Sequence, residues 1–202
     1  MAVFHAASAN PFTALFGAID NEVAPYGNVI KYSKFETRRY LPQLWAQVDY
    51  AVNSTEDFSE KSSAGFMPLF QYISGKNEKQ QKIPMTAPVY MQRIANPPGQ
   101  FRMAFVMPSS LFTKLEQMPK PTDSTVKIVA VTEPLTFSCI TFNMGLNGKR
   151  AAEKEAELRE AAAAAGTTLA TGVDSVRIAG YNPPWTLPWF RTNEVCIPLA
   201  KQ

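Results

Sequence analysis

The sequence predicts an α+β protein in which two helices cover one side or end of a mixed antiparallel sheet. Eight segments alternate apolar and polar residues with the period of two that β-strands show. Two further segments have the apolar spacing of an amphipathic helix. In chain order these elements read β-β-helix-β-β twice, without obvious residue identity between the halves. Strands in hairpin-sized pairs favour antiparallel neighbours, which is why the two helices are expected outside the sheet.

The chain of 202 residues suits one domain with a proper core. Residues 1–27 are predicted to be an N-terminal appendage with a short helix over 12–19, and residues 28–202 a single domain. The start lacks the basic region of a signal peptide, and no apolar run approaches the roughly 18 residues of a membrane helix. The 20 Lys and Arg are scattered and the net charge is +3, which argues against nucleic-acid binding. We expect a cytoplasmic monomer without a membrane span.

The first half begins with strand-like alternation over 29–40 and 44–52. A helix over 57–74 follows, starting near a capping-box-like pair, Ser54 and Asp57, and stopping at Gly75. Segments 82–92 and 101–107 are then predicted to be strands. Pro84 and Pro88 indicate that the first of these has a free edge or a bulge. In the strand over 44–52, the residues predicted to share one face are Leu44, Ala46, Val48, Tyr50 and Val52.

The second half repeats this order after a proline-rich join. The predicted strands are 126–133, 135–144, 175–181 and 193–200, and a helix spans 147–166. Glu155 and Arg159 are four residues apart on this helix and are expected to form an ion pair on a solvated face.

Cys139 and Cys196 are the only cysteines, and both lie in apolar alternating segments. We interpret them as buried free thiols in a reducing compartment, with a disulfide as the alternative.

Several classes of catalytic and metal site are excluded by composition. His5 is the only histidine and lies in the predicted appendage, so Ser-His and Cys-His catalysis lack a base. The sequence contains no Cys-x-x-Cys, His-Glu-x-x-His, Walker or dinucleotide-binding pattern. A binding function is therefore favoured over catalysis.

The helix over 57–74 has an apolar face where a surface helix is normally polar. Stepping 100° per residue, the core stripe contains Phe58, Gly65, Phe66, Leu69, Tyr72 and Ile73. The opposite face carries Ala64, Met67, Pro68 and Gln71, with Phe70 at the edge and Lys61 nearby. The pattern allows two interpretations: this face is a binding site, or a loop covers it.

The segment YNPPWTLPWFR (181–191) is a loop by composition but is rich in aromatic residues. A lid closing one end of the sheet is the favoured interpretation. The alternative is a rigid aromatic wall for a flat ligand, with Lys61 or Arg191 near an anionic edge.

Several ordered motifs resemble the SOUL/haem-binding protein family. They are FETRRY (35–40), FMPLFQYISGKN (66–77), KIPMTAPV (82–89), MPSSLF (107–112) and GYNPPWTLPWFRTNEVCIPL (180–199). The similarity runs from about residue 28 to the C-terminus.

This resemblance implies two β-α-β-β-type halves that form a distorted antiparallel eight-stranded sheet or barrel flanked by two long helices. Bacterial effector-binding domains share that architecture. It also implies a soluble carrier or buffer that binds haem or another tetrapyrrole reversibly and non-covalently, without catalysis. The ligand would lie in an apolar surface groove between the first long helix and the Pro/Trp loop. The residues this assigns to the groove are Lys61, Ala64, Met67, Phe70, Gln71, Tyr181, Trp185 and Thr186.

The sequence departs from the family at its polar positions. Some members are described with a histidine iron ligand, which this domain lacks, and family basic positions are Ala64 and Thr186 here. We therefore expect binding by apolar contact, with the iron free or weakly ligated by Met, Tyr or Cys. The alternatives are an enzyme that removes iron from haem, and a sensing module that uses the groove for another ligand or a peptide.

Overall fold

A computed structural model describes residues 11–52, 62–133 and 135–200. The helices are α1 (Pro11–Leu15), α2 (Ser62–Ile73) and α3 (Gly148–Ala164), and short 3₁₀ turns are η1 (Leu115–Gln117), η2 (Val173–Ser175) and η3 (Pro188–Phe190). The strands up to α2 are β1 (Glu22–Val23), β2 (Tyr26–Lys31), β3 (Glu36–Tyr40) and β4 (Gln43–Ala51). The later strands are β5 (Thr86–Ala87), β6 (Val89–Ile94), β7 (Gln100–Val106), β8 (Lys127–Val131), β9 (Thr136–Phe142), β10 (Arg177–Gly180) and β11 (Asn193–Pro198).

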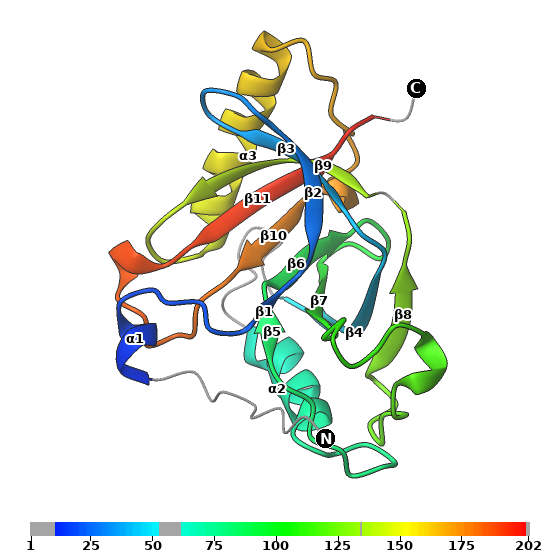
Figure 1. The fold of residues 1–202 in the computed structure, drawn as a ribbon. Coiled ribbons are helices and arrows are strands. Elements are labelled where there is room, and N and C mark those ends of the chain that lie inside the picture. The colour runs from blue at the N-terminus through cyan, green and yellow to red at the C-terminus, as the bar shows by residue number, and fades with distance from the viewer. Residues whose placement is uncertain (1–10, 53–61, 134, 201–202) are drawn as a thin grey trace.

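Nine strands form one curled antiparallel sheet, in the order β2-β3-β9-β11-β10-β6-β7-β4-β8 (Figure 1). This confirms the α+β class. The sheet has one strand more than expected because segment 29–40 is a hairpin rather than a single strand. Its turn is closed by the Tyr32 N–H, which donates to the Phe35 carbonyl at 2.9 Å, and the two rings stack with centroids 4.3 Å apart.

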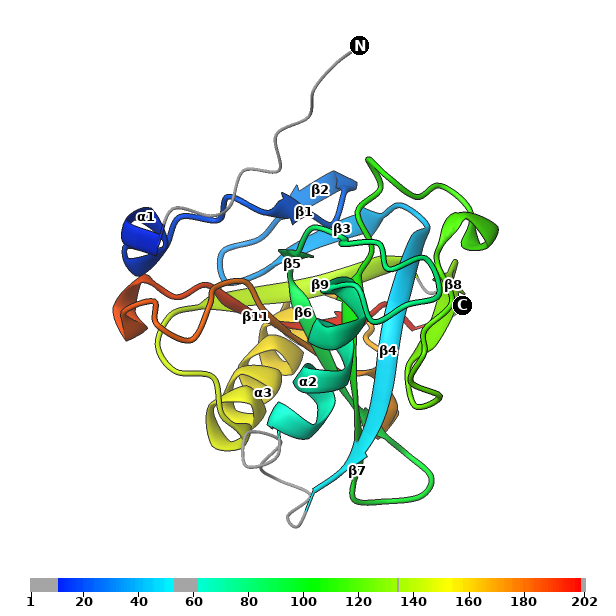
Figure 2. The same cartoon turned by 90° about the horizontal axis from the view of Figure 1, so that it is seen from below.

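Both long helices lie on the same, outer face of the sheet (Figure 2). Helix α2 packs against β4 and β7, and α3 packs against β9 and β11. The alternation predicted for 44–52 is confirmed: Ala46, Val48 and Tyr50 are buried in the core under the helices, and Leu44 and Val52 pack at its edge. The helix stripe is confirmed where the structure describes it, since Gly65, Leu69, Tyr72 and Ile73 are buried.

A second core fills the inside of the curl. Its large buried side chains include Trp45, Tyr90 and Phe137, which belong to the residues of β4, β6 and β9 that point away from the helices. Ala24 and Ala87 close this core where β1 pairs in parallel with β5. The inside of the sheet is therefore packed with aromatic side chains.

The segment KIPMTAPV is not one continuous strand, as had been expected for 82–92. Only Thr86 and Ala87 form β5, and a cis peptide bond joins Ala87 to Pro88 before β6 begins at Val89. Pro84 is exposed and Pro88 is buried. Two prolines remove two backbone donors, so the ladder of the large sheet begins only after the second one.

Helix α3 is confirmed close to its predicted bounds. The Asn147 side chain caps it by accepting from the Arg150 N–H at 2.9 Å, and Gly166 follows it with a φ of +70°. Glu155 and Arg159 form the expected ion pair at 3.0 Å. The predicted start of α2, with Ser54, Asp57 and Phe58, lies outside the described residues.

Cys139 and Cys196 form a disulfide, so the prediction of two free thiols is wrong. The two residues lie directly opposite each other on β9 and β11, with Cα atoms 4.1 Å apart. The cysteines are separated by 57 residues, and neither the pairing of these strands nor their register can be deduced from the sequence. Disulfides are uncommon in reducing compartments, so this bond does not support the predicted cytoplasmic location. That location stays a prediction.

Reducing this disulfide should lower the free energy of unfolding by about 2–4 kcal/mol, because it removes a constraint on a long loop of the unfolded chain. Urea unfolding with and without dithiothreitol measures the change. A Cys139→Ala/Cys196→Ala double variant is the control, and its unfolding midpoint should not respond to the reductant. An unchanged midpoint for the reduced wild-type protein would contradict the prediction.

Candidate functional site

The outward face of α2 is an exposed apolar surface. Ala64 is exposed, as are the side chains of Met67 (46% exposed) and Phe70 (45%). They lie there because Leu69 and Tyr72 on the opposite face are buried against the sheet. Among the described residues, no loop covers these three side chains, so the loop-covered interpretation does not hold for this part of the helix.

Gly65 explains why α2 lies so close to the sheet. A Cβ atom at this position would be 2.8 Å from the ring of Tyr50 and 3.1 Å from the Cβ of Met103. Only glycine permits this approach without displacing β4 or β7. The absence of a side chain at Gly65 therefore sets how closely α2 packs against β4 and β7.

Phe66 connects the outer face of α2 to the sheet. Its ring stacks with Phe70 at a centroid distance of 5.7 Å and meets Phe105 of β7 edge-on at 5.3 Å. Beside Phe105 in the sheet lies Val89 of β6, and beside Val89 lies Gly180 of β10. Because adjacent strands are about 5 Å apart, this row extends about 10 Å from the residue under α2.

Leu146 lies at the far end of this row, in the loop before α3. One of its methyl carbons is 3.6 Å from where a Cβ of Gly180 would be. Val89, Gly180 and Leu146 are all partly exposed. The exposed face of α2 and the partly exposed end of this row lie on either side of the buried Phe105. We call them together the apolar strip; its members are Ala64, Phe66, Met67, Phe70, Val89, Leu146 and Gly180.

The Pro/Trp loop starts where the strip ends, immediately after Gly180. It is anchored to α1 by two hydrogen bonds, from Thr186 Oγ1 to the Ala14 carbonyl (2.7 Å) and from the Leu187 N–H to the Leu15 carbonyl (3.1 Å). A third bond, from Asn182 Nδ2 to the Gly17 carbonyl (3.2 Å), joins it to the turn after α1. These bonds hold Trp185 and Trp189 outward, with 60% and 59% of their surfaces exposed. The loop is therefore fixed to the α1 region on one side and presents exposed aromatic side chains on the other.

The eight residues assigned by resemblance fall into different environments. Ala64, Met67, Phe70 and Trp185 are exposed, and Gln71 is partly buried, with its side-chain oxygen accepting from Lys76 Nζ at 3.0 Å. Tyr181 and Thr186 are buried, so their side chains do not reach the surface. Lys61 lies outside the described residues.

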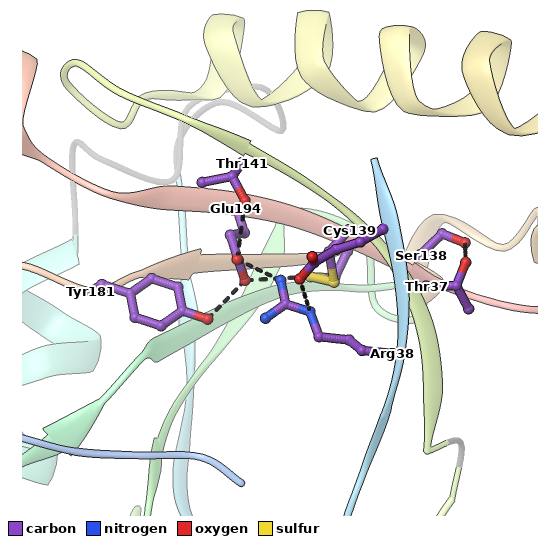
Figure 3. Close-up of polar contacts among 9 residues, drawn as sticks. Thr37, Arg38, Ser138, Cys139, Thr141, Tyr181 and Glu194 are labelled. Atoms are coloured by element: carbon purple, nitrogen blue, oxygen red, sulfur yellow. Dashed lines mark hydrogen bonds and ion pairs between the residues drawn. A yellow bond between two sulfur atoms is a disulfide. The ribbon is translucent and has the colours of Figure 1, made fainter. Parts of the chain in front are cut away.

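A polar cluster inside the curl, with Arg38, Tyr181 and Glu194 buried and Thr141 exposed at its edge, was not predicted. Glu194 of β11 accepts hydrogen bonds from Arg38 Nη2 at 2.5 Å, from the Tyr181 hydroxyl at 2.7 Å and from Thr141 Oγ1 at 3.2 Å (Figure 3). We call Arg38, Thr141, Tyr181 and Glu194 the inner polar cluster. A sequence signal existed: Arg38 and Glu194 occupy inward positions of alternating strands, where apolar residues are the rule.

The charged form of Arg38 in this cluster is stabilised by its ion pair with Glu194. Burial by itself lowers the pKa of Arg38, but Glu194 beside it outweighs that effect and raises the pKa of Arg38 overall. Burial also raises the pKa values of Tyr40 and Tyr181. Both tyrosines are therefore neutral, and the Tyr181 hydroxyl donates to Glu194, which also forms an ion pair with Arg38.

Buried tyrosines make the fold sensitive to alkali. Burial raises the pKa of Tyr90 to about 12, above its ordinary value near 10. A raised folded-state pKa contributes stability in full below pH 10, and this contribution is lost as pH rises from 10 through 12. Urea midpoints between pH 9 and 12 should therefore fall less steeply in Tyr90→Phe than in the wild type. Equal slopes for the two proteins would contradict this assignment.

Among the described residues, the only group of three possible metal ligands is Cys139, Glu194 and Cys196. The two sulfurs are bonded to each other, and Cys196 Sγ lies 3.9 Å from Glu194 Oε2. In this oxidation state the group offers no thiolate ligands.

Comparison with known proteins decides the family. The SOUL heme-binding protein domain matches residues 21–198. The chain belongs to the SOUL haem-binding protein family. Heme-binding protein 2 from Homo sapiens is 36% identical over 108 residues, which is 51% of this chain and 49% of that protein. Heme-binding protein 2 from Mus musculus is 37% identical over 89 residues, covering 43% and 40%. The match thus spans about half or less of these SOUL-family relatives.

Solved structures outside the family's close sequence range share the fold. A hydrolase from Listeria innocua superposes with a TM-score of 0.57 at 13% identity, covering 85% of this chain and 94% of that one. The EcmrR C-terminal domain superposes with a TM-score of 0.55 at 14% identity, covering 82% and 96%. At these identities the likeness supports the SOUL architecture alone. No helix among the described residues combines the length and apolar character needed to cross a bilayer.

Proposed function

We propose that this SOUL-family chain binds haem or another tetrapyrrole reversibly on the apolar strip, beside the Pro/Trp loop. The observation that carries the proposal is the exposure of Ala64, Met67 and Phe70 on α2. The partly exposed Val89 and Gly180 lie in the row of the sheet that passes under Phe66. An exposed apolar surface is typical of a binding site. Two relatives bear the name heme-binding protein, which agrees with a flat apolar ligand.

The proposed contacts are mainly apolar. One face of the tetrapyrrole lies over Phe66, Met67 and Phe70, and Trp185 lies at its side. Covering apolar surface contributes about 25 cal/mol per Å², so a flat macrocycle can be held without iron ligation. Tyr181 and Thr186 act in this proposal by positioning the loop, since both are buried and hydrogen-bonded.

Iron ligation by this chain has few candidates. The only histidine, His5, lies outside the described residues. Both cysteines are in the disulfide, and the Tyr181 hydroxyl donates to Glu194. Met67 and Met144 carry exposed side chains, and thioethers are weak ligands that favour reversible binding.

The proposed role is a carrier or buffer rather than an enzyme. The strip consists of apolar groups, which hold a ligand but do not transfer protons. Binding without catalysis therefore explains the composition of this surface more simply than iron removal.

Titration with haemin and with metal-free protoporphyrin IX tests the proposal. We expect saturable, similar sub-micromolar affinities for both, measured from the Soret band and from tryptophan fluorescence, because the strip contacts the macrocycle and not the metal. A lack of saturation with either compound would refute tetrapyrrole binding. Release of iron and accumulation of metal-free porphyrin would identify an enzyme instead, and recovery of a stoichiometric protein partner without pigment would identify a sensing module.

A further inference from the structure

Residues 13–25, from the end of α1 through β1, contact the rest of the protein at two separate places. One is the Pro/Trp loop, which lies beside α1 in Figure 1 and Figure 2. The other is β5, which β1 joins through the pairs Glu22–Thr86 and Val23–Ala87. We call residues 13–25 the strap.

The strap and the Pro/Trp loop are in direct backbone contact. In addition to the hydrogen bonds that residues 14, 15 and 17 accept from the loop, the rings of Phe16 and Phe190 meet edge-on with centroids 5.7 Å apart. Gly17 has a φ of +85°, and a Cβ atom there would lie 2.5 Å from the Phe190 carbonyl oxygen. Glycine permits both this conformation and this approach, so the position of the loop is tied to that of the strap.

Little apolar burial fixes the strap to the rest of the protein. Within residues 13–25, only Ala14 and Ala24 are buried, and alanine is the smallest of the apolar side chains. Stabilisation by apolar burial scales with the area covered, so a segment attached in this way opens locally at a low free-energy cost. Polar contacts therefore contribute much of the attachment.

Glu22 joins the strap to the loop that follows β7. Its carboxylate accepts from the N–H groups of Ser109 (2.7 Å) and Ser110 (3.3 Å), and from the hydroxyls of the same two residues (2.7 and 2.5 Å). Burial raises the pKa of Glu22, but the hydrogen bonds from Ser110 and Ser109 outweigh burial and lower the pKa overall. Glu22 is therefore ionised at neutral pH, and its charge strengthens these hydrogen bonds.

We propose that the strap is a conformational device that sets the position of the Pro/Trp loop, and that Glu22 is the clasp that keeps the strap closed. Glu22 acts on the loop through residues 14–17, so it is a positioning residue. Loss of its contact with Ser109 and Ser110 frees the strap and, with it, the loop that presents Trp185. Both serines are exposed, so solvent reaches the clasp. The inference concerns contacts within the chain and does not rest on tetrapyrrole binding.

Hydrogen exchange at single backbone amides tests the proposal without a ligand. The Ala24 N–H donates to a carbonyl of β5 at 2.9 Å and reports on the strap, and the Leu187 N–H donates to a carbonyl of α1 at 3.1 Å and reports on the loop. The Ala170 N–H, which donates to a carbonyl of β11 at 2.9 Å, is the reference for the rest of the fold. We expect Glu22→Ala to speed exchange at Ala24 and Leu187 about ten-fold or more, with Ala170 unchanged within about three-fold.

Three more variants make the test specific. Ser110→Asp places a second carboxylate against Glu22 and should speed exchange at both reporter amides at least as much as Glu22→Ala. Glu22→Gln keeps one acceptor oxygen, so its exchange rates should lie between those of the wild type and Glu22→Ala. Asp123→Ala is the matched control, because Asp123 is an exposed carboxylate that accepts from the N–H (2.9 Å) and the hydroxyl (2.7 Å) of Thr125 outside the strap. It should leave both reporter amides within about three-fold of the wild type.

Three outcomes would overturn the proposal. Faster exchange at Ala24 without faster exchange at Leu187 would show that the strap does not position the loop. Equal acceleration at Ala24, Leu187 and Ala170 would show that Glu22 supports the whole fold, and unchanged exchange at all three would show that Glu22 is not the clasp. Since no tetrapyrrole is added, failure of this proposal is distinguishable from failure of haemin and protoporphyrin IX to bind.

Discussion

Replacing Met67 by aspartate should weaken the binding of both haemin and protoporphyrin IX about 10- to 100-fold. Met67 lies at the centre of the exposed face of α2, and losing its apolar contact costs about 1.5–3 kcal/mol, which is one to two powers of ten in affinity. The introduced carboxylate also repels the carboxylates of the tetrapyrrole. Titrations followed by Soret absorbance measure the change.

Two further variants make the result specific. Ile30→Asp places the same charge at another exposed apolar residue, on the edge strand β2, and should bind like the wild type. Because Met67 and Ile30 are exposed, both aspartate variants should unfold within about 0.5 kcal/mol of the wild type. Met67→Leu should keep its affinity for both ligands. If it loses affinity for haemin alone, Met67 is an iron ligand; if Met67→Asp binds normally, the strip is not the site.

Replacing Glu194 by glutamine should destabilise the fold by about 3–5 kcal/mol, because Arg38 then keeps a buried charge without its main partner. The side chains of Arg38 and Glu194 are 1% and 7% exposed, and water cannot replace the lost carboxylate. Urea unfolding measures the loss.

The exposed pair Arg102 and Asp49 provides a matched control. It joins the same chemical groups at 2.7 Å, but with 34% and 42% of the side chains exposed. Asp49→Asn should therefore cost less than about 1 kcal/mol. Removing both buried charges, as in Arg38→Met/Glu194→Leu, should recover much of the stability lost in Glu194→Gln. Similar costs for Glu194→Gln and Asp49→Asn would show that burial does not control the energy of this pair.

Much of the fold could be predicted because apolar periodicity reports which side of an element is buried. The strand over 44–52 and the stripe on α2 follow the predicted faces where the structure describes them, although Phe66 of the stripe is only partly buried. The hairpin of β2 and β3 was missed because its turn, around Tyr32 and Phe35, lacks glycine and proline and is held by ring stacking. The interruption at Pro88 was missed because prolines restrict a strand but do not show where its pairing begins.

The candidate site was partly predictable for the same reason. The exposed side of α2, with Ala64, Met67 and Phe70, follows from helical spacing alone. Residues in an aperiodic loop carry no such signal. Thr186 and Trp185 are neighbours in sequence, yet one is buried against α1 and the other is exposed, because the hydrogen bonds to residues 14, 15 and 17 set the orientation of the loop.

The sequence by itself determined the α+β class, the faces of the helices and most strands, and the motifs of the SOUL family. These properties depend on residues within one element or on ordered local motifs. Tertiary structure alone decided that Cys139 meets Cys196, that Glu194 meets Arg38, and that Arg177 lies between two aromatic rings. Each of these contacts joins strands far apart in the chain. Their partners are set by the register of the sheet, which no local pattern in either segment specifies.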